Sequence, residues 1–178
     1  MVVGGLWLAV PFAAGQQRSA ASNHPDTFGL GRAATAGEIE ALDIDVRPDG
    51  TGLPAGQGTA ADGARTWARA CGGCHGQEGE GGTAAPVVGR DPSSRPPTVG
   101  NYWPYATTLY DYINRAMPRN APGTLAADEV YGLVAWILAK NEIIATEAIM
   151  DAETLPKVAM PARSRFVRDD RRGGPEVR

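Results

Sequence analysis

The stretch "RACGGCHGQEGEGG", residues 69–82, contains both cysteines of the chain, Cys71 and Cys74, and one of its two histidines, His75. Two thiols this close in sequence suit three chemistries: a redox dithiol, half of a zinc site, or the attachment site of a covalent haem. The sequence around the motif distinguishes among the three.

The dithiol and zinc interpretations fit poorly. A dithiol oxidoreductase carries its Cys-x-x-Cys in a βαβ setting, but here a helical pattern precedes the motif and no strand pattern lies near it. Zinc needs four ligands. The neighbours Cys74 and His75 point apart, and the only other histidine, His24, lies in a loop-rich segment.

Haem uses every residue of the motif. Cys-x-x-Cys-His is the signature of c-type haem attachment, in which the two thiols form thioethers and the histidine ligates the iron. We therefore predict one haem c, bound covalently through Cys71 and Cys74 with His75 as an axial ligand. A haem would also add apolar volume to a chain that is only 7% aromatic.

Three helices are predicted around the motif. The first spans residues 60–71, with Thr59 and Asp62 placed for a capping box, and it brings Cys71 to its apolar face. The loop-rich stretch 76–105 follows, and a loop of this length is typical of a segment that wraps a ligand.

The other two helices follow this loop. The second is predicted over residues 109–116 and ends before Pro118, which cannot continue a helix. The third spans residues 127–140 and is apolar on nearly every side, so we expect it to be buried. The fold class is therefore mainly α.

The sixth iron ligand is sought among Met117, Met150, Met160 and His24. Met117 lies at a helix end and begins the Gly/Pro-rich loop "MPRNAPGTL", which could fold over a flat cofactor. We predict Met117 as the ligand, with Met160 as the next candidate. An open iron site, as in a haem sensor or a peroxidase, is the alternative.

The ends of the chain are read as a leader and two arms. Residues 1–15 are apolar but shorter than the ~20 residues of a membrane-spanning helix, and they are predicted as a secretory signal without its basic start. We expect a periplasmic protein without a stable membrane span. An N-terminal arm (16–57), a haem domain (58–146) and a C-terminal tail (147–178) follow. The net charge of −3 argues against a nucleic-acid partner.

The order of "GARTWARACGGCHG", "AP", "AMP" and "LVAWILAK" resembles the monohaem class I cytochromes c over residues 58–141. The resemblance implies that the carbonyl of Pro86 orients His75. It also implies that the first and last helices cross at a small and an aromatic residue on each, here Gly63, Trp67, Leu133 and Trp136.

A more specific resemblance extends over residues 30–163. The segments "LGRAATAGEIEALDIDVRPDGTGLPAGQGT", "NYWPYATTLYDYINRAMP", "DEVYGLVAWIL" and "DAETLPKVAMPAR" resemble the cytochrome c subunits of sulfane dehydrogenase, the SoxD family of bacterial sulfur oxidation. It implies a molybdenum subunit, SoxC-like, as the electron donor and another cytochrome as the acceptor. Some members carry two haem domains, whereas this chain has one attachment motif.

The expected role is electron transfer within an oxidoreductase complex rather than catalysis by the chain itself. Two alternatives are a free electron shuttle, which would have no need of the arms, and the cytochrome subunit of a sulfite dehydrogenase. Tyr102 and Trp103 are predicted to approach the haem propionates. They could equally fill the loop.

Overall fold

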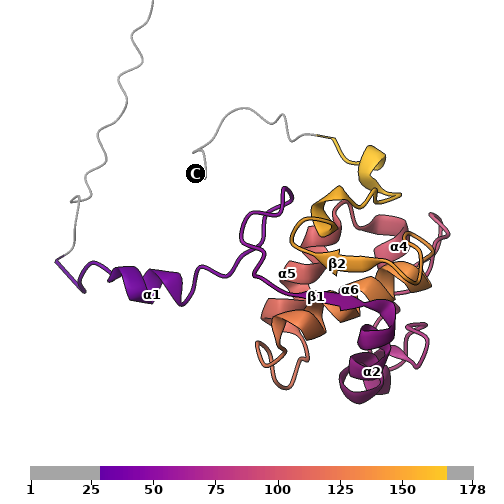
Figure 1. Ribbon diagram of the computed structural model, residues 1–178, viewed down its shortest axis with the longest axis horizontal. Coiled ribbons are helices and arrows are strands. Elements are labelled where there is room, and N and C mark those ends of the chain that lie inside the picture. The colour runs from indigo at the N-terminus through magenta and orange to yellow at the C-terminus, as the bar shows by residue number, and fades with distance from the viewer. Residues whose placement is uncertain (1–28, 168–178) are drawn as a thin grey trace, which may run out of the picture. The chain divides into compact units, whose positions relative to one another are not determined.

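The computed structural model describes residues 29–167 (Figure 1). The expected signal, His24 and the end of the tail lie outside these residues. The chain divides into two compact units, residues 1–35 and 36–178. In the first unit, residues 29–35 are exposed and form neither helix nor strand.

The second unit is mainly helical, as predicted. Three longer helices carry the core, namely α2 (Ala60–Ala70), α5 (Ala106–Ala116) and α6 (Ala127–Lys140). Shorter helices are α1 (Ala36–Glu40), α3 (Gly72–His75), α4 (Val99–Tyr102), η1 (Leu155–Lys157) and η2 (Arg163–Arg165), and the two strands are β1 (Gln57–Thr59) and β2 (Ile149–Asp151).

Local sequence explains where these helices begin and end. The Asp62 amide donates to the Thr59 hydroxyl and the Thr59 amide donates to the Asp62 carboxylate, so the expected capping box opens α2. Helix α5 ends at Ala116, before Pro118, as predicted. It begins at Ala106, three residues earlier than expected, where Ala106 and Thr107 are both buried.

Helices α2 and α6 cross in close contact. A Cβ atom added at Gly63 would lie 1.9 Å from the carbonyl oxygen of Gly132, so only glycine permits the approach. Beside this contact the rings of Trp67 and Trp136 stack at 4.2 Å. The resemblance placed Leu133 at this crossing, but the small residue that contacts Gly63 is Gly132; Leu133, the next residue, is buried in the core.

The flanking segments contribute to this core. Strand β2 pairs antiparallel with β1, with Met150 opposite Gly58 (Figure 1). Four residues of the expected tail are buried, namely Met150, Leu155, Met160 and Ala162. On the N-terminal side Val46 is buried, and its amide donates to a carboxylate oxygen of Asp111 at 2.9 Å. The core therefore extends beyond residues 58–146.

None of the helices found in residues 29–167 has the length and apolar character needed to cross a bilayer.

Candidate haem site

The attachment motif lies at the C-terminal end of helix α2 and in the single turn of helix α3. The Cys71 amide closes α2 by donating to the Trp67 carbonyl, and α3 then begins at Gly72. Within this turn the amides of Cys74 and His75 both donate to the Cys71 carbonyl. Both thiols are free; Cys74 is exposed, whereas Cys71 is half-buried, and burial raises the pKa of its thiol to about 11.

The ring of His75 has a backbone partner. Its Nδ1 lies 2.8 Å from the carbonyl oxygen of Ala85. When Nδ1–H donates to this oxygen, the ring is held in the tautomer that leaves Nε2 free for a metal. The sequence resemblance implied the carbonyl of Pro86, but the acceptor belongs to Ala85, the residue before it.

The loop that carries this acceptor is bonded back to the motif. The Ala84 amide donates to the Cys74 carbonyl and the Gly81 amide donates to the His75 carbonyl. Trp67 adds a side-chain bond, from Nε1 to the carbonyl of Gly76 at 3.0 Å. The position of His75 therefore depends both on α2 and on the loop.

Met117 is the most accessible methionine in the described part of the chain. It directly follows α5, its amide donates to the Ile113 carbonyl, and its side chain is half-buried. Met150 and Met160 are only 4% and 5% exposed and pack in the core. A thioether buried in the core is poorly placed to reach a cofactor, so the geometry favours Met117 over Met160.

Several apolar side chains of the haem domain pack against the core without being fully covered. Val87, Trp103 and Leu125 pack against the core but remain half-exposed, as do Cys71 and Met117. An imidazole, a thioether and two thiols are the donor set that holds a haem c, and half-exposed apolar side chains suit a large flat apolar ligand.

The two aromatic residues expected near the propionates contact other rings. Tyr102 is exposed and meets Phe166 edge-on, with ring centroids 5.5 Å apart. Trp103 is half-buried and meets Tyr112 edge-on at 5.8 Å. These contacts account for the position of both side chains within the protein.

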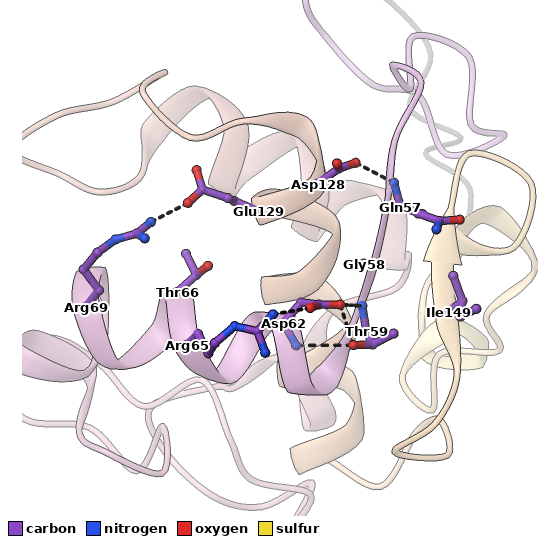
Figure 2. Close-up of a pocket in the computed structure, with 10 residues that line it drawn as sticks. All are labelled: Gln57, Gly58, Thr59, Asp62, Arg65, Thr66, Arg69, Asp128, Glu129 and Ile149. Carbon is purple, nitrogen blue, oxygen red and sulfur yellow. Dashed lines mark hydrogen bonds and ion pairs between the residues drawn. The ribbon is translucent and has the colours of Figure 1, made fainter.

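A separate pocket of about 510 Å³ lies between α2, the start of α6 and the two strands (Figure 2). Its charged groups bond to one another or to the backbone. Arg69 pairs with Glu129, and Asp128 accepts from the Gln57 amide at 2.8 Å. None of the predicted site residues lines it, and its contacts tie α2, α6 and β1 together.

Two residues of the site were missed by sequence reasoning. Ala85 supplies the acceptor for His75, and a backbone carbonyl leaves no signal in residue type. Asn141, the residue that follows the third predicted helix, is fully buried and bonded to the loop that carries Ala85. A buried amide just after an apolar helix is the signal that could have identified it.

Two comparisons with known proteins found matches to the chain. Residues 58–137 match the family described as cytochrome C oxidase, cbb3-type, subunit III. No curated protein sequence matches the chain. A solved structure, described as the crystal structure of the sulfane dehydrogenase SoxCD from Paracoccus pantotrophus, matches with 36% identity and a TM-score of 0.73. The match covers 81% of this chain and 73% of that chain.

The described fold is that of a class I cytochrome c, and membership of this class implies haem c as the cofactor. The chain belongs to the family of SoxD-like c-type cytochromes.

Proposed function

We propose that the chain is a periplasmic haem c protein that takes electrons from the molybdenum subunit of a sulfane dehydrogenase during thiosulfate oxidation. It passes them to another cytochrome. The observation that carries this proposal is the extent of the SoxCD match. That match covers 81% of the chain at 36% identity, well beyond the cytochrome segment 58–137.

The proposed cofactor is a single haem c held by four residues. Cys71 and Cys74 would hold the haem through two thioether bonds, each formed by addition of S–H across one vinyl C=C. His75 and Met117 would ligate its iron, and a methionine ligand favours a higher reduction potential. When bound, the haem supplies one-electron transfer between ferric and ferrous iron. The Ala85 carbonyl holds the His75 ring in position for this ligation.

The segment that begins with helix α1 has the exposed apolar surface expected of a binding site for a protein partner. Helix α1 and the residues after it expose three large apolar side chains, Ile39, Leu42 and Ile44, the second of them 83% exposed. Glu40, Asp43 and Asp45 lie among them, so the segment is acidic as well as apolar. A free electron shuttle has no need of such a segment, whereas a subunit can bury it against a partner of matching charge.

The proposal includes export and a domain division. Residues 1–15 are removed as a signal, and residues 16–57 and 147–178 flank the haem domain 58–146. The ends of both flanking segments nearest the domain complete its core, through Val46, Met150 and Leu155. Their outer parts are proposed to dock on the molybdenum subunit.

Co-expression with a SoxC-like molybdenum subunit tests this function. The two chains should co-elute in gel filtration, and the haem protein should be reduced when a sulfane-carrying substrate is added. Leu42→Asp should weaken both association and enzyme-driven reduction because it places a charge on the exposed apolar segment.

The matched control is Ala61→Asp, which places the same charge on an exposed side chain in the first turn of α2, outside both flanking segments. Ascorbate should reduce all three proteins equally well. Failure of the wild-type chain to co-elute, together with equal rates for sulfane and sulfite substrates, would contradict the proposal.

A further inference from the structure

We propose that Asn141 is a positioning residue for the haem ligand His75. Its buried side-chain amide holds the loop that carries Ala85, and the carbonyl of Ala85 accepts the hydrogen bond from the His75 ring. The inference rests on the proposed ligation of haem by His75, but it does not depend on which partner donates electrons.

The side chain of Asn141 is fully buried and bonds only to backbone. Its Nδ2 donates to the carbonyl of Ile137 at 2.8 Å and to that of Val87 at 3.2 Å. Its Oδ1 accepts from the Gly89 amide at 2.9 Å. One buried amide thus joins the end of α6 to two positions of the loop, and leaving such backbone groups without partners would be costly.

Neighbouring residues tighten the same junction. The Thr98 hydroxyl donates to the Gly89 carbonyl, and the Val99 amide donates to the Val87 carbonyl. A Cβ atom added at Gly100 would lie 2.2 Å from Asn141 Oδ1 and 2.6 Å from the Gly89 carbonyl oxygen. The loop therefore passes through a space with no room for another atom.

The junction lies next to the histidine acceptor. Ala85 is two residues before Val87, whose amide donates to the Gly79 carbonyl at 2.9 Å. On the other side of Ala85, the Ala84 amide donates to the Cys74 carbonyl at 2.9 Å. The Ala85 carbonyl is thus held between the attachment motif and the Asn141 junction, and it cannot move far while both hold.

Helix α6 therefore contacts the segments that carry both partners of the hydrogen bond, the donor His75 and the acceptor Ala85. Through the Gly63–Gly132 contact it positions α2, which leads to His75. Through Asn141 it positions the loop that carries Ala85. Helix α6 therefore positions both His75 and Ala85, and with them the hydrogen bond between the two residues.

This bond controls the electron density of the ligand. A hydrogen bond from the second ring nitrogen raises the basicity of a ligating histidine, which favours the more positively charged ferric iron. Loosening the loop should weaken the bond, make His75 a poorer electron donor and move the reduction potential upward.

Two variants test the inference in the haem-loaded protein. Asn141→Ala removes the amide, and Gly100→Ala pushes Asn141 and Gly89 apart without removing a polar group. The controls are Thr107→Val, which removes another buried side-chain hydrogen bond far from the loop in sequence, and Gly37→Ala, whose added methyl meets nothing within 4 Å.

Both test variants should show an upward shift of the potential in titration with small-molecule mediators. The solvent exchange of the His75 ring N–H, followed by NMR in the ferrous protein, should accelerate about threefold to tenfold, the scale of one hydrogen bond. The controls should match the wild type in both measurements.

The inference is overturned if the test variants match the controls in either measurement. If Asn141→Ala does not fold, Gly100→Ala decides the matter alone. A wild-type protein without haem would instead defeat the proposed function, whereas a haem-loaded protein with unresponsive variants defeats only this inference.

Discussion

The indole rings of Trp67 and Trp136 stack with centroids 4.2 Å apart and planes 23° from parallel, where α2 crosses α6. Trp67 also donates from Nε1 to the carbonyl of Gly76, the residue that follows His75. The crossing of the two helices and the attachment motif therefore share one side chain, and packing at the crossing reaches the candidate haem site.

Trp136→Ala should destabilise the protein while leaving the iron ligands in place. Removing a large buried aromatic typically costs ~3–5 kcal/mol, a considerable part of the ~5–15 kcal/mol that stabilises a domain. Thermal unfolding followed by far-UV circular dichroism measures the loss. Leu42→Ala, at a side chain that is 83% exposed, is the control and should leave the melting temperature unchanged. Equal melting temperatures for the two variants would show that the stacked tryptophans do not stabilise the core.

The helices were largely predictable because each leaves a local pattern in the sequence. The capping box at Thr59 and the stop before Pro118 mark two helix boundaries, and both are confirmed. The resemblance placed the crossing at Leu133, one residue after Gly132, because a family resemblance does not show which residue of this helix contacts its partner. A glycine inside a helix costs about 1 kcal/mol relative to alanine, so Gly132 itself was the available signal.

The packing of the flanking segments could not be predicted in the same way. Met150 lies in a strand of three residues, and Leu155 begins a single 3-10 turn. Elements this short show no period of hydrophobicity, and only the partner surface determines that their side chains are buried.

A fragment of residues 59–145 should therefore be less stable than one of residues 46–167. The shorter fragment lacks five buried side chains, namely Val46, Met150, Leu155, Met160 and Ala162. Truncating a single buried Leu or Met costs ~2–5 kcal/mol, so the combined loss is comparable with the whole stability of a domain. Urea unfolding of both fragments in the haem-loaded state measures it. Equal midpoints and slopes would show that the flanking segments do not belong to the core.

The site was predictable in its covalent chemistry but not in its supporting bonds. The spacing of Cys71, Cys74 and His75 specifies haem attachment with no knowledge of the fold. The Ala85 acceptor and the Asn141 junction depend on how a loop folds back, which residue types alone do not encode.

Met117→Ala should remove the sulfur ligand. The weak charge-transfer band of ferric iron bonded to a thioether should disappear, and the reduction potential should fall because the thioether favours ferrous iron. Met160→Ala is the matched control; because its side chain is buried in the core, it should lower stability and leave the band intact. Loss of the band in the control instead of the test variant would assign the ligand to Met160.

The cap of α2 should make stability depend on acidity. Hydrogen bonds from the Thr59 side chain and backbone lower the pKa of Asp62 below its ordinary value. A carboxylate with a lowered folded-state pKa stabilises the fold above its unfolded pKa, and this contribution is lost as the pH falls through the folded value. The difference in unfolding free energy between wild type and Asp62→Asn should therefore be constant near neutral pH and shrink below about pH 4. A difference that stays constant into this acidic range would show that the carboxylate charge has no part in the cap.

The mass of the mature protein after acid-acetone extraction tests the central claim most directly, because this treatment removes haem that is not covalently bound. The account predicts that the chain keeps the mass of one haem, and that replacing both Cys71 and Cys74 with alanine abolishes this retention. A protein that releases its haem into the organic phase, or whose mass lacks a haem, would contradict the assignment of the Cys71–His75 motif as a haem-attachment site.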